Sequence, residues 1–425
     1  MDNLTNVTTA LSGAASTPEP ATYASRNTRY WRINLAISVF GSFTTLLSLS
    51  MLLPFLPLYV RQLGVQSTAA VVQWSGVAFG VTFLGTALTA PIWGQLADRY
   101  GRKPMLVRAA VGMAIVMSTI GLAHNVYELV ALRFAAGLIG GYASASTVMI
   151  GTQAPPERSG WALGMLSTGV LAGNLVGPLI GGLLPNLIGI RGAFFAAGAM
   201  IAVAAVLTIA FVREDFVRPQ RRDATLQRGA AAGVLDGKHG YFVLSALFAT
   251  ATMVLLSNMS IEPIITVYIA QLGVSAHRLA TVAGIVMAGS AFGSMLMAAR
   301  LGALADRIGA WKVIVGCLIA TAVVVLPQAF VVHWWQLAAL RGLMGMTLAG
   351  LLPSITKLVR QTVDERSSGK MLGYLQSAQY AGQVVGPLIG GAIGVHFGLR
   401  DVFLATAALL IVCAALDTFV YRKRA

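Results

Sequence analysis

The chain has 425 residues, of which 56% are hydrophobic and 11% are charged, and its formal net charge at neutral pH is +15. A soluble domain carries about 25% charged residues, so this composition excludes an ordinary soluble enzyme and indicates that most of the chain lies in lipid. The mean hydropathy of +0.75 agrees with this reading. An excess of basic over acidic residues can also indicate nucleic-acid binding, but the positions of the charges along the chain argue against a nucleic-acid partner.

Residues 1–32 are polar and lack the basic start and short apolar core of a signal peptide, so we expect a disordered cytoplasmic tail. A bilayer core of about 30 Å needs about 20 apolar residues per helix, and twelve such stretches follow. They are 33–60, 72–97, 104–123, 126–153, 160–185, 190–212, 240–270, 278–304, 310–331, 334–358, 368–394 and 399–421. Backbone groups in lipid must pair within their own segment, which predicts an all-α integral membrane protein.

Charge placement orients these spans. Only four of the 30 Lys and Arg residues fall in the loops of one side (Arg61, Arg191, Arg278 and Arg400), and two more (Arg133 and Arg341) lie inside spans. The rest are assigned to the tails and to the alternate loops, together with the span ends beside those loops, which places both termini in the cytoplasm by the positive-inside rule. We therefore expect a bundle at 33–212, a cytoplasmic linker at 213–239, a second bundle at 240–421 and a basic end at 422–425.

The two predicted bundles repeat each other. Residues 54–65 resemble 263–274, and residues 176–182 recur as 385–391, both at an offset of 209. Arg133 and Arg341 correspond at an offset of 208. Duplicated six-helix halves typically hold a substrate between them near the bilayer midplane and rock around it. The repeat therefore predicts a transporter rather than an enzyme.

A polar loop at 94–106 separates two of the apolar runs and returns, weakened, at 302–312. Cations are favoured at a helix C-terminus, and glycine permits the turn there. The residues concerned are Gly94, Asp98, Arg99, Gly101, Arg102 and Lys103, with Asp306 and Arg307 in the second copy. They resemble the loop between helices two and three of the major facilitator superfamily, which locks the two halves on the cytoplasmic side. An ordinary basic loop is the alternative interpretation.

The fifth predicted span carries glycines four residues apart, which share one face and allow close helix packing. They lie with a proline in the set Gly173, Gly177, Pro178, Gly181 and Gly182, and the eleventh span repeats the pattern at Gly386 and Pro387. This set resembles the signature of major facilitator antiporters, which implies exchange rather than uptake. Helix packing alone is the alternative.

Two ionisable residues lie inside the predicted spans and are candidates for proton coupling. Glu262 interrupts an apolar run, and its repeat counterpart is Leu53, so the fold does not require a carboxyl there. A carboxyl in an apolar medium can bind and release a proton. Arg133 occupies the position of the family's helix-four arginine, which the resemblance associates with proton transfer. A structural ion pair for Glu262 and an outward-reaching Arg133 are the alternatives.

Further polar and adaptable side chains inside the spans predict a substrate cavity. They are Asn258, Met259, Arg341, Gln376, Tyr380 and Gln383. The sequence contains no metal-ligand spacing, nucleotide loop or catalytic triad, so we expect no enzyme activity, cofactor or metal.

The resemblance covers nearly all of residues 33–421 and is strongest to the twelve-helix drug:proton antiporter family. Within it, residues 51–60 and 160–164 resemble a group of multidrug resistance proteins. The resemblance implies a multi-pass protein of the cell inner membrane that exports amphipathic drugs in exchange for protons. One chain contains both halves, so a monomer suffices. A metabolite antiporter, a proton symporter and a membrane sensor remain alternatives.

Overall fold

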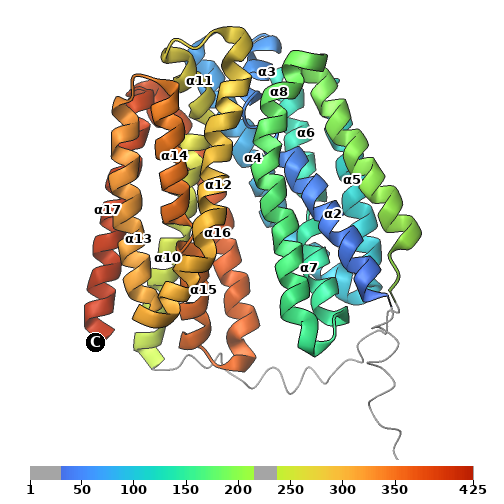
Figure 1. The fold of residues 1–425 in the computed structure, drawn as a ribbon, viewed down its shortest axis with the longest axis vertical. Coiled ribbons are helices and arrows are strands. Elements are labelled where there is room, and N and C mark those ends of the chain that lie inside the picture. The colour runs from blue at the N-terminus through green and yellow to red at the C-terminus, as the bar shows by residue number, and fades with distance from the viewer. Residues whose placement is uncertain (1–29, 215–236, 425) are drawn as a thin grey trace, which may run out of the picture.

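The computed structural model describes residues 30–214 and 237–424, and the regular elements of these ranges are helices (Figure 1). In the first half they are α2 (Trp31–Ser50), α3 (Leu56–Gln62), α4 (Thr68–Tyr100), α5 (Arg102–Ile120), α6 (Val126–Ile139), α7 (Tyr142–Gln153) and α8 (Pro156–Phe211). In the second half they are α10 (Gly237–Ile261), η1 (Glu262–Ile264), α11 (Ile265–Gln271), α12 (Ala276–Ile308), α13 (Ala310–Val325), η2 (Leu326–Phe330), α14 (Trp334–Leu348), α15 (Leu351–Thr362), α16 (Glu365–His396) and α17 (Leu399–Arg424). Residues 1–29 of the tail predicted at 1–32 and most of the linker predicted at 213–239 lie outside the described residues, and α2 begins within the predicted tail, at Trp31.

Ten helical stretches of the described chain are long and apolar enough to cross a membrane. One of them, α8, has 56 residues and leaves helical geometry at Gly189, where φ is 76°, so the two stretches expected at 160–185 and 190–212 form its two arms. Other expected stretches are interrupted by turns or breaks. Pro54 lies in the turn between α2 and α3, Pro263 in η1, and glycines lie between α6 and α7. Proline removes a backbone donor, and glycine permits the left-handed backbone of Gly141, where φ is 110°.

The helices of the two halves stand side by side (Figure 1). We call the end that carries Trp31, Phe211, Gly237 and Arg424 the lower end, as drawn there. Within the first half, α2 and α5 pack along α8; within the second, α10 packs on α16, α12 on α14 and α13 on α17. The halves meet where α4 packs on α16 and α8 on α12, so these four helices line the boundary between them.

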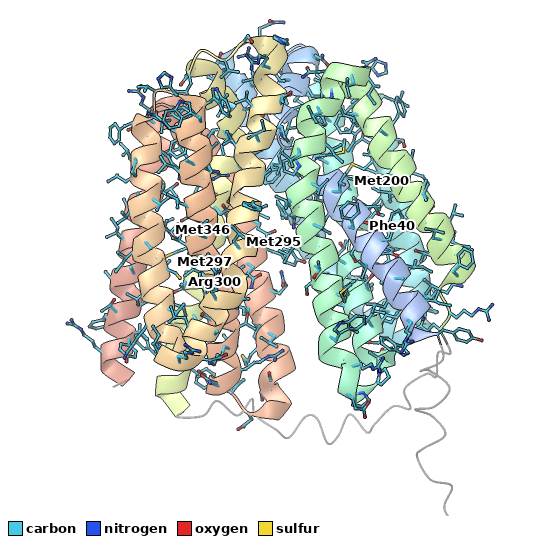
Figure 2. The ribbon with its side chains drawn as sticks, viewed as in Figure 1. Phe40, Met200, Met295, Met297, Arg300 and Met346 are labelled. Carbon is cyan, nitrogen blue, oxygen red and sulfur yellow. The ribbon has the colours of Figure 1, made fainter. Side chains whose placement is uncertain are left out.

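Large apolar side chains cover the outside of the helices (Figure 2). Phe40 is 36% exposed and Met295 is 48% exposed, and many leucines, valines and isoleucines are more exposed still. Contiguous apolar surface of this kind is not stable in water and indicates a membrane. The chain is therefore an integral membrane protein.

The glycines of α8 allow it to lie directly against two other helices. On one face, added Cβ atoms at Gly173, Gly177 and Gly181 would collide with carbonyl oxygens of α2 and of the residue that follows it, those of Phe43, Leu47 and Met51. On the other face, a Cβ at Gly182 would lie 2.8 Å from the Ala280 carbonyl oxygen of α12, in the second half. The same motif thus packs the first half and reaches the boundary. In α16, Gly382, Gly386 and Gly390 face α10 in the same way.

We expect Gly181→Ala to lower the thermal unfolding midpoint of the purified protein in detergent. The added methyl group meets backbone atoms of Met51, which cannot rotate away, and such overpacking costs about 1–3 kcal/mol. Gly164→Ala on the same helix is the matched control, because nothing lies within 4 Å of a Cβ at that position. Equal midpoints for the two variants would contradict the packing role.

Candidate functional site

An ion pair lies inside the second half. Arg341 Nη2 of α14 lies 2.6 Å from Glu262 Oε1. The arginine has no exposed surface, and the glutamate is 8% exposed. Arg341 Nη1 also lies 3.5 Å from the sulfur of Met344. Because each charge offsets the cost of burying the other, removing either partner would leave an uncompensated charge among apolar side chains.

The local sequence explains where Glu262 lies. Proline at 263 has no N–H, so the carbonyl of Met259 loses its usual helical donor. The regular helix α10 ends at Ile261, and Glu262 begins the short 3₁₀ segment η1. η1 packs against α4 and α16 as well as α10, which places Glu262 on a break in the helix beside the boundary between the halves.

Arg133 lies at the corresponding place in the first half but has no acidic partner. It is fully buried in α6, and its Nε donates to the Ala78 carbonyl at 3.1 Å. Its two terminal nitrogens have no hydrogen-bond partner among the described residues. Its guanidinium carbon lies 5.9 Å from the centre of the Phe79 ring. The structure therefore brings Arg341, and not Arg133, into contact with Glu262.

The loop motif makes its contacts within each half. Asp98 pairs with Arg102 across the turn at Gly101, whose φ of 97° suits glycine. The backbone N–H groups of Arg102 and Lys103 donate to Glu214 at 2.8 and 2.6 Å, so a carboxylate caps the N-terminus of α5. In the second copy, Asp306 pairs with Lys357 at 2.6 Å. Gly94, Arg99 and Arg307 are exposed.

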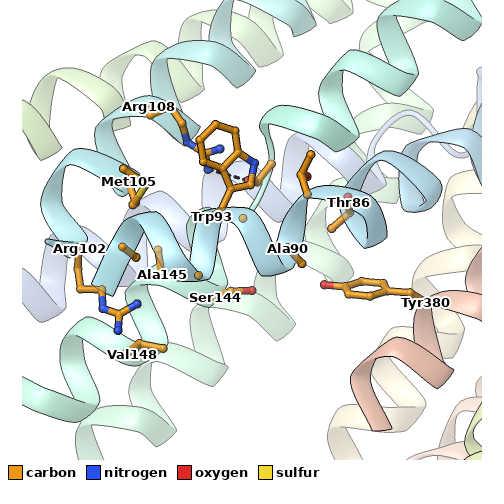
Figure 3. Close-up of a pocket in the computed structure, with 15 residues that line it drawn as sticks. Thr86, Ala90, Trp93, Arg102, Met105, Arg108, Ser144, Ala145, Val148 and Tyr380 are labelled. Atoms are coloured by element: carbon orange, nitrogen blue, oxygen red, sulfur yellow. Dashed lines mark hydrogen bonds between the residues drawn. The ribbon is translucent and has the colours of Figure 1, made fainter. Parts of the chain in front are cut away.

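A cavity of about 130 Å³ lies between α4, α5 and α7, with Tyr380 of α16 directed toward it (Figure 3). Arg108 stacks on Trp93, with 3.5 Å between its guanidinium carbon and the ring centre, and its Nη2 donates to the Gly140 carbonyl at 3.0 Å. Trp93 donates in turn to the Leu138 carbonyl at 2.7 Å. Aromatic and aliphatic surface with a few polar edges suits an amphipathic small molecule.

The other residues predicted to line a cavity are spread along α10 and α16. Asn258, Met259 and Gln383 are half-buried, whereas Gln376 is exposed. Asn258 Oδ1 has no hydrogen-bond partner among the described residues. Of the six predicted cavity residues, only Tyr380 lines the cavity of Figure 3. Where side chains are described, no three His, Cys, Asp or Glu residues form a group that could hold a metal ion.

Hydrogen bonds join the two halves away from the lower end. Thr266 of α11 donates to the Pro54 carbonyl at 2.9 Å, and Thr281 of α12 donates to the Gly182 carbonyl at 2.8 Å. Asn186 donates to Thr281 at 3.1 Å. We call these three hydrogen bonds the upper seal.

Several of these residues were missed by the sequence reasoning. Arg108 follows the basic loop by five residues, and a lone arginine within an apolar run is a usable signal. Thr266 and Glu214 give no local signal, since their partners are distant in the sequence. Asp417, buried in α17, lies near the end of its predicted span, where an acid is a weaker signal than in the middle.

The sequence pattern of the Major Facilitator Superfamily matches residues 38–282 and 247–425. The multidrug resistance protein MdtG of Serratia proteamaculans is 39% identical over 394 residues, covering 93% of this chain and 95% of that protein. MdtG of Proteus mirabilis is 39% identical over 380 residues, covering 89% of this chain and 94% of its own length.

Solved structures share the fold. A bacterial homologue of the human lysosomal transporter Spinster, in an inward-facing and occupied conformation, superposes with a TM-score of 0.76 at 16% identity, covering 92% of this chain and 97% of that one. The human organic anion transporter MFSD10 superposes with a TM-score of 0.65 at 18% identity, covering 91% and 99%. With its helical membrane fold, its loop motif and these matches, the chain belongs to the Major Facilitator Superfamily.

Proposed function

We propose that this protein exports amphipathic drugs across the cell inner membrane in exchange for protons, by alternating access. The identity of about 39% with MdtG multidrug resistance proteins over nearly the whole chain supports a drug transporter. The observation that carries the proton coupling is the buried pair of Glu262 and Arg341 at a break in a helix beside the boundary between the halves. The glycine and proline motif of α8 supports exchange rather than uptake.

The proposed architecture has twelve spans in two pseudo-symmetric bundles, 33–212 and 240–421, with both termini cytoplasmic. Two features add to the ten candidate spans: the reversal of α8 at Gly189 and the apolar, glycine-rich body of α16. The repeat supports the pseudo-symmetry. Tyr59 donates to the Ile120 carbonyl, and its ring packs at a tilt against Phe194. Tyr268 makes the equivalent contacts in the second half, with the Gln328 carbonyl and the Phe403 ring. A single chain forms both halves, so the proposed unit is a monomer.

The described conformation is assigned to the inward-facing state. The positive-inside rule places the lower end in the cytoplasm, and the upper seal closes the opposite side. In this state the loop motif is not engaged between the halves, because Asp98 pairs with Arg102 within its own loop. Two structures of the Spinster homologue in inward-facing conformations superpose with TM-scores of 0.76 and 0.73, which agrees with this assignment. Asp98 and its basic loop would lock the lower end in the outward-facing state.

The proposed coupling step is a proton transfer to and from Glu262. In the outward-facing state the carboxylate takes up one proton from the outer side, which neutralises it and leaves Arg341 as an uncompensated cation. In the inward-facing state the proton leaves to the cytoplasm and the ion pair forms again, as described here. The pair thus shifts the equilibrium between the outward-facing and inward-facing states. The size of the shift is the difference between these states in the free energy of burying an unpaired arginine. Arg133 is proposed to assist from the first half.

The upper seal connects this proton transfer to the opening of the upper side. Thr266 lies one helical turn after Glu262, on the segment that continues from η1, and its hydroxyl holds the Pro54 carbonyl of the first half. A shift of η1 that accompanies the change of charge at Glu262 would move Thr266 with it. The seal would then open after Glu262 has lost its proton to the cytoplasm and close after it has taken up a proton from the outer side.

We expect Glu262→Gln to abolish efflux driven by a pH gradient in proteoliposomes while drug binding is retained, because the amide cannot carry a titrating proton. Glu157→Gln at the exposed start of α8 is the control with the same chemical change. Efflux would be followed with a fluorescent substrate identified by an efflux screen in a pump-deficient host. Unchanged driven efflux in Glu262→Gln would reject the coupling scheme.

We expect Arg341→Gln to destabilise the protein by about 3–5 kcal/mol, since it leaves the Glu262 carboxylate buried without its cation. In the double variant Glu262→Gln with Arg341→Gln, both charges are absent, and most of the stability should return. Thermal unfolding in detergent measures both. A double variant that is stable yet inactive in driven efflux separates coupling from folding, whereas full driven efflux in it would refute the proposal.

We expect Thr266→Val to favour opening of the upper side, because it removes a buried hydrogen bond worth about 1 kcal/mol, which is about a fivefold change in population. The reporter is Ser144→Cys, on the wall of the cavity of Figure 3, in a protein without its two native cysteines. A membrane-impermeant thiol reagent added from the cytoplasmic side, in inside-out vesicles, should label it more slowly in Thr266→Val, because the lower end closes as the upper side opens, and normally in Thr266→Ser. Equal labelling rates with Thr266, Thr266→Val and Thr266→Ser would show that Thr266 does not hold the upper seal closed.

A further inference from the structure

A second acid lies buried in the second half, away from the Glu262–Arg341 pair. Asp417 of α17 is 1% exposed, seven residues before the end of the helix at the lower end. Its contact is with Thr250 of α10, whose hydroxyl oxygen lies 2.8 Å from Asp417 Oδ1 and 3.0 Å from Oδ2. The mechanism proposed above makes no use of this carboxyl.

The hydrogen bonds around Thr250 need one more proton than the hydroxyl can supply. Its oxygen lies 2.9 Å from the Ala246 carbonyl as well as close to both carboxyl oxygens of Asp417. A hydroxyl has one proton to donate, and Ala246 is the acceptor that a threonine in a helix normally uses. If Asp417 carries a proton, it donates to Thr250 while Thr250 donates to Ala246, and both contacts are satisfied.

The first half has neutral groups at the equivalent position. Thr208 occupies the position equivalent to Asp417, at the offset of 209 that relates the halves. Its hydroxyl donates to the Ala204 carbonyl at 2.7 Å and lies 2.8 Å from the Tyr142 hydroxyl, which can donate to it. Here a second hydroxyl supplies the extra proton. The fold therefore accepts a neutral residue at this position, and the acid of the second half is not needed for packing.

No cation offsets a charge on Asp417 among the described side chains. The titratable neighbour on its own helix is the buried thiol of Cys413, and α10 presents Thr250. α13, α16 and η2, which also pack on α17, make no described ion pair with it. An isolated carboxylate in such surroundings is costly, and the group neutralises instead.

We propose that Asp417 is a second proton-binding site, occupied in the inward-facing state described here. This role in the transport cycle rests on the proton coupling proposed above. Release leaves a carboxylate and gives one proton to water, so it requires α10 and α17 to part and admit water from the lower end. α10 carries Thr250, and Glu262 follows directly after the end of this helix. A movement of α10 would therefore alter the surroundings of both acids together.

Infrared spectroscopy of the purified full-length protein at neutral pH tests whether Asp417 holds its proton. We expect the carbonyl band of a protonated carboxyl in the wild type and in Glu262→Gln, and its loss in Asp417→Asn. Thr250→Val should shift the band to higher frequency, because the acid loses its acceptor, whereas Thr250→Ser should leave it in place. If the band of the wild type were still present in Asp417→Asn, the assignment would be overturned.

Proton counting tests the role in transport. In weakly buffered proteoliposomes, protons moved per drug molecule should fall in Asp417→Asn and in Asp417→Thr, which places at 417 the residue type found at 208. The second variant keeps the test valid if the first does not fold. An unchanged proton count with the infrared band lost would overturn the transport role. No proton movement in the wild type would refute the proposed function instead, and the infrared result on Asp417 would still stand.

Discussion

The fold depends on the close approach of helix backbones at glycine. In lipid there is no hydrophobic force between helices, so packing itself must hold them together, and glycines at 173, 177 and 181 let α8 lie against α2 at the separation of backbone atoms. The adjacent Gly182 carries the same helix to α12 across the boundary. Because these contacts use backbone and small residues, the polar side chains remain available for the site.

The few charges that the protein buries are treated in different ways. Glu262 and Arg341 compensate each other directly, whereas Arg133 has one backbone acceptor and an aromatic ring nearby. Arg108 stacks on Trp93 beside a cavity. An embedded charge is costly unless it has a partner or a wet surface, so Arg133 is the least compensated of these three arginines.

The two halves share a scaffold but differ in chemistry. At two equivalent positions the first half has neutral residues, Leu53 and Thr208, where the second has acids, Glu262 and Asp417. Glu262 lies on η1, which continues from α10, and Asp417 contacts Thr250 of α10. The duplication accounts for the shared scaffold, while the buried acids of the described residues lie in the second half, which suits a carrier whose halves move relative to each other.

The sequence alone determined the helical membrane fold and the repeat, and it singled out the glycine pattern and Glu262 as candidates, because hydropathy, period and an acid in an apolar run are local properties. The roles of Arg133 in proton coupling and of Asp98 in the lock stay predictions; in the described structure Arg133 donates to the Ala78 carbonyl and Asp98 pairs with Arg102. Arg341 lies 79 residues from Glu262, and Thr250 lies 167 residues from Asp417. Only the tertiary structure decided those pairs, because which side chains meet depends on how whole helices pack and where prolines break them, and that is set by contacts between segments far apart in the chain.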